Sequence, residues 1–314
     1  MLIGHDPAWQ AWRQAMSGER MHHAWLLTGK KGLGKASFAQ AAARLLLDAG
    51  SDGEHPDILT LTHGPKNKDE AKKRDDGKPY ERARGIKVDQ VRAMQRRLNT
   101  RPTLGDKRVV IIDPADDMEV SASNALLKSL EEPPEGTYFM LVAHSPARLL
   151  PTIRSRCRTI RFAALASEQM DALLETLAPQ ADHATRDAAK AAAGGSPGAA
   201  LAIMDLQLGE AATLMRQIVT KGDADFTLRG RLSAAIGAKQ DIVRLQAALS
   251  LARAILAERI DAALNDPRPL VDTHVELVRL SGEQPTYNFD PGLLGMEIGT
   301  LLAQAGAASE RTDA

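Results

Sequence analysis

The sequence of 314 residues predicts an α/β domain with a parallel sheet and a phosphate-binding loop at 1–162, a small helical domain at 163–207 and an all-helical domain at 208–314. Short apolar runs alternate with helical patterns in the first half, which is typical of strand–helix–strand units. A glycine-rich turn that ends in lysine follows the first of these runs. After Phe162 the strand signals stop, and apolar residues recur with the spacing of packed helices.

The elements of the first domain follow from their apolar patterns. Continuous apolar runs indicate strands buried on both faces of a parallel sheet, and they lie at 24–28, 58–61, 108–112 and 138–143. Helical spacing predicts helices at 36–47, 86–98 and 122–130, the last of them halted by Pro133 and Pro134. Two or three short helices are expected at 163–205, and a helical bundle from 209 onward.

The segment at 63–85 interrupts this pattern. It has almost no large apolar residues and is crowded with lysine, arginine, aspartate and glutamate. Such a composition favours a solvated, mobile loop. The alternative is an insertion that contacts DNA or a partner protein, which the mixed signs of its charges argue against.

Bulk charge and cysteine content exclude several classes of protein. Forty basic and forty acidic residues give a formal net charge of zero, which argues against a broad basic field for independent nucleic-acid binding. The single cysteine, Cys157, can form neither an internal disulfide nor a cysteine-rich zinc site. No signal peptide and no membrane-spanning apolar stretch is evident, so a cytoplasmic location is expected, without membrane contact.

A phosphate-binding loop is the clearest motif. It consists of Gly29, Lys30, Lys31, Gly32, Leu33, Gly34, Lys35 and Ala36, and it matches the nucleotide-binding pattern in every position except the last. Glycines let backbone N–H groups face phosphate oxygens, and the lysine neutralises the β- and γ-phosphates. A plain glycine turn between strand and helix is the alternative interpretation.

Two elements needed for hydrolysis are absent. Position 36 should carry a hydroxyl that ligates Mg²⁺, but Ala36 has only a methyl group, and Ser37 points about 100° away around the helix. Asp113 ends the strand at 108–112 and could hold Mg²⁺ through water. Pro114 follows it, so autonomous hydrolysis is not expected, and we predict no required cofactor while ATP or ADP binding stays possible.

Several local motifs resemble one family. The segment at 124–134, Asn-Ala-Leu-Leu-Lys-Ser-Leu-Glu-Glu-Pro-Pro, is similar to a motif of the AAA+ clamp-loader subunits of bacterial DNA polymerase III. Ser155-Arg156-Cys157 matches the Ser-Arg-Cys signature of those subunits. His55-Pro56-Asp57 and the residues at 23–26 are also similar to delta-prime and gamma/tau sequences, so the resemblance covers about the first 160 residues.

Within that family the resemblance is to the delta-prime rather than the motor subunits. Motor subunits carry threonine after the loop lysine and glutamate after the strand aspartate, where this chain has Ala36 and Pro114. The sensor-2 region at 195–201 has no arginine. The four cysteines of the family's zinc module are missing from 47–54, so no zinc is expected. The resemblance implies a helical lid at 163–207 and a C-terminal collar at 208–314.

The resemblance also implies roles and partners. Arg156 would act as an arginine finger in a neighbouring subunit's ATP site, unless it merely pairs with an acid on its own surface. Cys157 would be a packing residue. Expected partners are gamma/tau and delta subunits in a hetero-oligomeric ring, with the sliding clamp and primed DNA reached through the complex. The chain would then be part of the polymerase III holoenzyme rather than an enzyme on its own.

Two other functions stay open at this point. One is an autonomous AAA+ ATPase that uses Asp116 or Asp117 in place of the missing glutamate. The other is a nucleotide-gated binding module, whose loop holds ATP or ADP without hydrolysing it.

Overall fold

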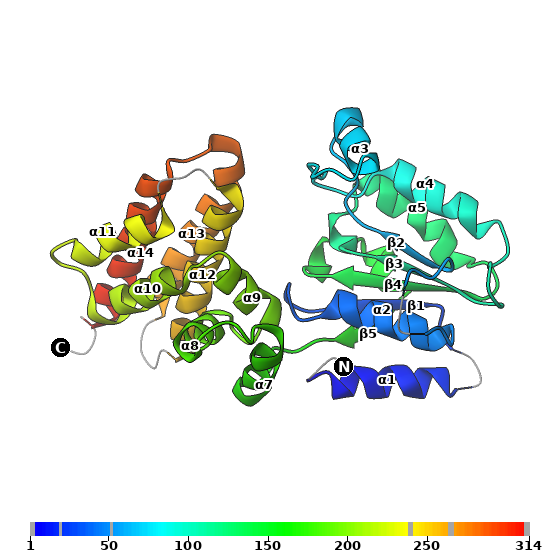
Figure 1. Cartoon of the computed structure of the whole chain (residues 1–314), viewed down its shortest axis with the longest axis horizontal. Helices are drawn as coiled ribbons and strands as arrows, with labels where there is room; N and C mark the ends of the chain where they lie inside the picture. The colour runs from blue at the N-terminus through cyan, green and yellow to red at the C-terminus, as the bar shows by residue number, and fades with distance from the viewer. Residues whose placement is uncertain (1–3, 19–20, 51–52, 238–240, 263–266, 311–314) are drawn as a thin grey trace. The chain divides into compact units, whose positions relative to one another are not determined.

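A computed structural model describes residues 4–18, 21–50, 53–237, 241–262 and 267–310. The chain forms two compact units, Met1–Ala164 and Leu165–Ala314 (Figure 1). The first unit carries a parallel sheet between helical layers, and the described part of the second is helical throughout. The predicted fold class is therefore confirmed.

The sheet of the first unit has five parallel strands in the order β2-β3-β4-β1-β5. Their bounds are Ala24–Thr28 (β1), Ile58–Leu61 (β2), Arg108–Ile112 (β3), Thr137–Ala143 (β4) and Arg158–Arg161 (β5). Every residue of β1 and β3 is buried, as expected for strands covered on both faces. Because all strands run in one direction, their carboxyl ends share one edge of the sheet and their amino ends share the other.

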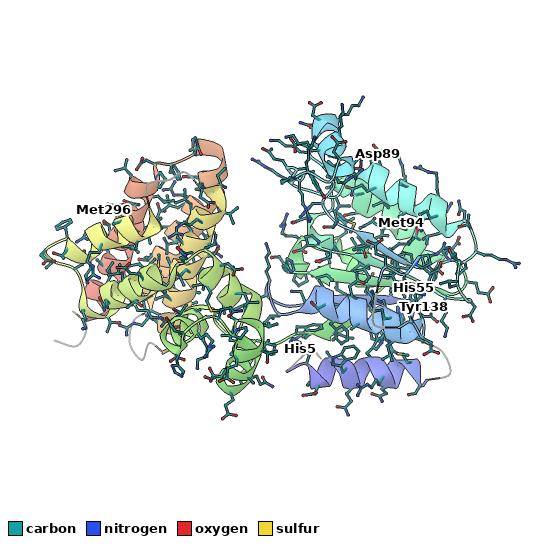
Figure 2. The ribbon with its side chains drawn as sticks, in the orientation of Figure 1. His5, His55, Asp89, Met94, Tyr138 and Met296 are labelled. Atoms are coloured by element: carbon teal, nitrogen blue, oxygen red, sulfur yellow. The ribbon has the colours of Figure 1, made fainter. Side chains whose placement is uncertain are left out.

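Helices cover both faces of this sheet (Figure 1). One face packs against α1 (Asp6–Met16) and α2 (Lys35–Leu46), and the other against α4 (Val88–Leu98) and α5 (Val120–Glu131). On α4, Met94 points toward the sheet and is buried, whereas Asp89 points outward and is exposed (Figure 2). Short helical turns lie at Ala115–Asp117 (η1), Pro146–Arg148 (η2) and Pro151–Arg154 (α6).

The charged segment at 63–85 is not the irregular loop that its composition favours, because it contains a helix, α3 (Lys68–Asp75). The Asn67 side chain caps this helix by accepting a hydrogen bond from the Glu70 amide (2.9 Å). Acidic residues occupy the first turn and basic residues the last, which complements the helix dipole. Capping and charge order, rather than an apolar face, are the sequence signals of this helix.

The second unit has one apolar core shared by its helices. These are α7 (Ser167–Leu177), α8 (His183–Ala192), α9 (Pro197–Asp205), α10 (Gly209–Lys221), α11 (Thr227–Ile236), α12 (Ile242–Ala262), α13 (Arg268–Tyr287) and α14 (Pro291–Glu310). The division into a lid and a collar at 207/208 stays a prediction. Within the described residues, no helix is both long and apolar enough to cross a membrane.

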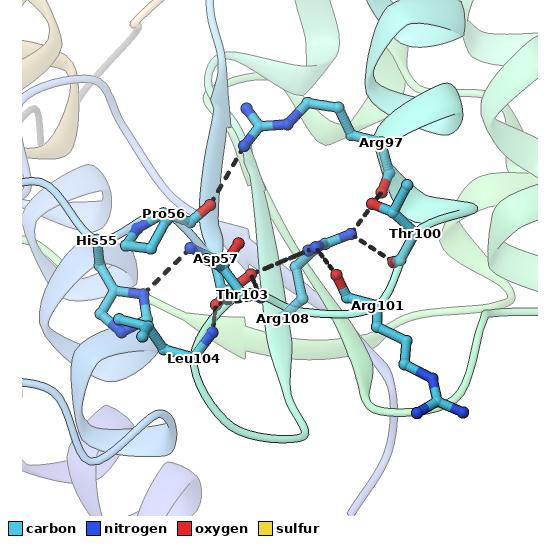
Figure 3. Close-up of polar contacts among 9 residues, drawn as sticks. All are labelled: His55, Pro56, Asp57, Arg97, Thr100, Arg101, Thr103, Leu104 and Arg108. Carbon is cyan, nitrogen blue, oxygen red and sulfur yellow. Dashed lines mark hydrogen bonds and ion pairs between the residues drawn. The ribbon is translucent and has the colours of Figure 1, made fainter.

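A buried ion pair holds the amino edge of the sheet (Figure 3). Asp57 is fully buried just before β2, and Arg108, the first residue of β3, is 4% exposed. The carboxylate accepts hydrogen bonds from Arg108 Nη2 (3.3 Å) and from the amides of Thr103 and Leu104 (2.8 and 2.7 Å). Burial alone would raise the pKa of Asp57, but these hydrogen bonds hold that pKa below its ordinary value.

The guanidinium of Arg108 also donates hydrogen bonds on the side that faces away from Asp57. It donates to the carbonyl oxygen of Arg97 (2.5 Å), in the last turn of α4, and to those of Thr100 (3.1 Å) and Arg101 (2.8 Å), which follow that helix (Figure 3). Asp57 and Arg108 therefore join strands β2 and β3 to the loop at 99–107. Removing either charge leaves the other buried and unpaired.

We expect Asp57→Asn to lower the free energy of unfolding by about 3–5 kcal/mol at neutral pH, because it leaves the Arg108 guanidinium without its anion. Urea denaturation measures this change. Since the folded-state pKa of Asp57 is depressed, its contribution is present above the unfolded pKa and is lost as acid protonates the folded carboxylate. Exposed Asp89→Asn is the control, and an equal effect of both changes would contradict the assignment.

Candidate nucleotide site and arginine motif

The backbone angles of the loop between β1 and α2 require glycine at three positions. Gly29, Gly32 and Gly34 have φ values of +147°, +84° and +81°, a region that side chains disfavour. A Cβ on Gly29 would also lie 2.5 Å from the carbonyl oxygen of Phe162. These angles explain why glycines occupy the three positions, and the loop leads into the amino end of α2, where backbone N–H groups can meet an anion. Phosphate binding by this loop stays a prediction.

Two contacts fix this loop on the domain. The Leu33 side chain is 1% exposed and belongs to the core beside α1 and α2. Buried His5, which precedes α1, hydrogen-bonds through Nε2 to the Leu33 carbonyl (2.6 Å). His5 was not identified from the sequence, since the contact joins residues that are 28 positions apart.

The side chain of the loop lysine contacts the backbone of its own loop. Lys35 is 2% exposed, and its Nζ donates to the carbonyl oxygens of Gly29 (2.6 Å) and Lys30 (2.7 Å). Burial lowers the pKa of Lys35 to about 8, although the charges of Asp113 and Asp116 oppose the shift. The ammonium is therefore held by carbonyl oxygens of the loop itself, without a full ion pair.

The position after the lysine offers no metal ligand. Ala36 is half-buried, and Ser37 is exposed on a different side of α2. Lys30 and Lys31 are exposed at the start of the loop. Among the described residues, no group of three or more histidine, cysteine, aspartate or glutamate side chains is arranged to hold a metal ion.

Asp113 lies where the sequence places it, at the carboxyl end of β3 and next to the loop edge of the sheet. Burial raises the pKa of Asp113, and the nearby charges of His144 and Lys35 act against that rise. Pro114 follows at the position where a catalytic glutamate would stand. Asp113 is thus coupled to Lys35 by charge, but the next side chain cannot accept a proton from water.

Asp116 has a structural function. Its carboxylate is buried and accepts hydrogen bonds from the backbone amides of His144 (3.0 Å) and Ser145 (2.7 Å), just after β4. Both oxygens take part, since the second also lies 3.1 Å from the His144 amide. The carboxylate therefore fixes the carboxyl end of β4 and is not directed at an attacking water.

Asp117 is also engaged. Its carboxylate lies 3.2 Å from His63 Nε2 and accepts a hydrogen bond from Arg148 Nη1 (2.9 Å). Neither aspartate thus offers a free carboxylate in place of the missing glutamate, and the geometry gives no support to an autonomous ATPase that depends on them.

His144 is a second residue that sequence reasoning missed. It follows β4 directly, it is half-buried, and its Nδ1 is buried without a hydrogen-bond partner among the described residues. Burial and then the charge of Lys35 lower the pKa of His144, whereas the carboxylates of Asp116 and Asp113 act against this shift. A polar residue directly after a buried parallel strand was the available signal, because Asp113 and Gly29 occupy the same place after β3 and β1.

Arg156 lies between α6 and β5, at the amino edge of the sheet, whereas the loop at 29–36 lies at the carboxyl edge. In the parallel register Arg158 pairs with Trp25 at the start of β1, while Gly29 follows the end of β1. Trp25 and Gly29 are four residues apart, which corresponds to roughly 13 Å along the strand. Arg156 precedes Arg158 by two residues, so it lies still farther from Gly29. The arginine motif and the phosphate loop of one chain therefore belong to different surfaces.

Arg156 makes contacts with its own domain in the structure. Its Nη2 forms an ion pair with Glu131, the last residue of α5, and its Nη1 donates to the Thr152 carbonyl (2.9 Å). The arginine side chain keeps 34% of its surface exposed. The pairing with an acid on the same surface, one of the two interpretations of the sequence, is thus present in the structure. It joins the motif at 124–134 to the Ser-Arg-Cys motif.

The flanking residues of the arginine motif differ in environment. Ser155 is exposed and donates to the Thr152 carbonyl (3.1 Å). Cys157 packs against the core on the α4 and α5 side, and burial raises its pKa to about 12. A thiol with that pKa stays neutral at pH 7, so it has the properties of a packing residue and not of a nucleophile.

We expect replacement of Lys35 by methionine to remove a pH-dependent component of stability. The folded pKa of about 8 lies below the ordinary lysine value of about 10.4, so the unfolded chain binds more protons between these values. Stability of the wild-type chain therefore gains about 2 kcal/mol from Lys35 between about pH 7 and about pH 10. Urea denaturation of both proteins measures the difference, and a gap that does not change with pH would contradict it.

Comparison with known proteins assigns this arrangement to a family. The family model described as "DNA polymerase III, delta subunit" matches residues 4–166. A DNA polymerase III subunit delta' of Pseudomonas aeruginosa is 40% identical over 167 residues, which cover 46% of each chain. The delta' subunit of Escherichia coli is 33% identical over 200 residues, 59% of this chain and 55% of that one.

Gamma and gamma/tau proteins are also similar to this chain. A DNA polymerase III subunit gamma/tau of Mycobacterium tuberculosis is 31% identical over 72% of this chain and 40% of its own. A solved gamma subunit-related protein from Thermotoga maritima matches 96% of this chain and 100% of that chain, with 20% identity and a TM-score of 0.49. The aligned part spans about half the length of the curated delta' relatives. The chain belongs to the family of the DNA polymerase III delta subunit, and its relatives there include delta' subunits.

Proposed function

We propose that the chain is a delta' subunit of a bacterial clamp loader, which assembles with gamma/tau and delta subunits to place a sliding clamp on primed DNA. The family match and the names of the relatives support this role. In the proposal the chain works in the cytoplasm as part of the polymerase III holoenzyme. The energy of ATP is used at the gamma/tau sites.

The contribution of this chain to catalysis is Arg156, acting on a neighbour. The observation that carries this proposal is the position of Arg156 at the amino edge of the sheet, where it cannot reach its own phosphate loop. A guanidinium keeps its charge at all working pH values and matches the oxygens of a transferring phosphoryl group. In other enzymes such residues raise the rate by about 10³–10⁵.

Glu131 gives this arginine a defined resting position. The ion pair keeps the guanidinium at the end of α5, while 34% exposure of the side chain leaves it accessible to a partner. Exchange of one carboxylate for a neighbour's phosphate needs only rotation about side-chain bonds. The surface pair and the arginine-finger role are therefore two states of one residue.

The chain's own loop serves at most to bind nucleotide. Its glycine conformations and the buried lysine favour binding of a phosphate group. Ala36 supplies no hydroxyl for Mg²⁺, Pro114 supplies no base, and the carboxylates of Asp116 and Asp117 are engaged elsewhere. A loop that holds ATP or ADP without hydrolysis is the second candidate role, and no cofactor or zinc is required for the first.

Reconstitution of the loader tests the proposal. With gamma/tau, delta, clamp and primed DNA present, we expect Arg156→Ala to lower the ATPase rate at least about 100-fold at the site that it faces. Lys35→Ala should change the rate little, because its loop is not a site of hydrolysis. The measurement is steady-state phosphate release, together with single-turnover traces that separate the sites.

The neighbouring exposed Arg154→Ala is the matched control, since it removes an equal charge three residues after Pro151 without touching the Ser-Arg-Cys motif. A large loss with Lys35→Ala and none with Arg156→Ala would reject the arginine-finger role. Equal losses with Arg154→Ala and Arg156→Ala would show a general charge effect.

A further inference from the structure

The inserted segment at 63–85 is firmly attached to the domain. It begins at the carboxyl end of β2, and its two ends pair through the amide of Lys66 with the Glu81 carbonyl (3.0 Å) and the amide of Ala83 with the Gly64 carbonyl (2.7 Å). Ile86, just after it, exchanges backbone hydrogen bonds with the segment that follows β3. Figure 1 shows α3 at the end of the first unit, beside α4.

Most acidic side chains of this segment form hydrogen bonds or ion pairs with other residues of the segment. Glu70 is 8% exposed and accepts hydrogen bonds from the Glu81 amide (2.6 Å) and from Lys73 (2.7 Å). Glu81 pairs with Lys66 at 2.6 Å. The remaining pairs are Asp75 with Arg74 (2.8 Å) and Asp76 with Lys78 (3.3 Å). Four of its five acids thus have a basic partner inside the segment.

Four cations are left facing solvent, and together they are called the insertion surface: Lys68, Lys72, Arg82 and Arg84. Among the described residues, none of the four has an acidic partner within ion-pair distance. Lys68 and Lys72 lie one turn apart on the same side of α3. Arg82 and Arg84 are two residues apart just before Ile86, and the Arg82 guanidinium lies 5.9 Å from the centre of the Tyr80 ring.

The segment offers no apolar anchor for a protein partner. Between residues 63 and 85 there is no leucine, isoleucine, valine, methionine, phenylalanine or tryptophan, and Tyr80 is half-buried. Protein interfaces depend on such anchors, whereas contacts with a phosphate backbone depend on exposed lysine and arginine. Eight basic residues against five acidic ones also give the segment a positive charge within a chain of zero net charge.

We propose that the insertion surface binds the phosphate backbone of nucleic acid without regard to base sequence. Its lysines and arginines would neutralise phosphates and release counterions, which makes the binding steeply dependent on salt. The backbone hydrogen bonds at the two ends of the segment keep the insertion surface at one place on the first unit. This inference does not rest on the arginine-finger role of Arg156.

The test uses the full chain and a fluorescein-labelled DNA duplex, with affinity measured by anisotropy over a series of salt concentrations. The variant carries Lys68→Gln, Lys72→Gln, Arg82→Gln and Arg84→Gln together. We expect affinity at low salt to fall more than about tenfold, and the slope of log K against log salt to become smaller by about 3–4. Far-UV circular dichroism and thermal melting check that the variant is folded.

The matched control replaces four exposed cations elsewhere by glutamine: Arg13, Lys221, Arg231 and Arg259. It should keep both the affinity and the slope of the wild type. Unchanged DNA binding in the insertion variant, or an equal loss in the control, would overturn the proposal. Binding of a polyglutamate chain of matched charge as tightly as the duplex would also overturn it, because the surface would then select an acidic protein segment equally well.

Discussion

The common direction of the five strands is the constraint on which the rest of the first unit depends. It collects the phosphate loop, Asp113 and His144 at the carboxyl edge of the sheet, and it leaves the Ser-Arg-Cys motif at the amino edge. The glycine loop and Arg156 therefore lie at opposite ends of the strands. In the proposed function, this separation is what leaves Arg156 available to a neighbouring subunit.

Buried carboxylates fix both edges. At the amino edge Asp57 pairs with Arg108 and joins β2, β3 and the loop at 99–107. At the carboxyl edge Asp116 accepts the amides that follow β4. Each is satisfied by several donors, which offsets the cost of removing a charge from water. The consequence for the site is that Asp116 fixes the backbone that follows β4.

The sequence predicted the layered fold because apolar runs and helical periodicity report burial directly. It also predicted the loop at 29–36, since only glycines tolerate those backbone angles. It did not reveal α3, whose stability comes from a cap and internal ion pairs instead of an apolar face. His5, His144 and the pairing of Arg156 with Glu131 were hidden as well, because each contact joins residues far apart in the chain.

The proposed division of labour, with a nucleotide loop that does not hydrolyse ATP and an Arg156 that serves a neighbouring subunit, is tested most directly by a structure. The complex would be assembled with gamma/tau and delta and trapped with ADP and aluminium fluoride. We expect the Arg156 guanidinium to have left Glu131 and to lie within hydrogen-bond distance of the fluoride in an adjacent subunit. An Arg156 that still pairs with Glu131, remote from every bound nucleotide, would contradict the account.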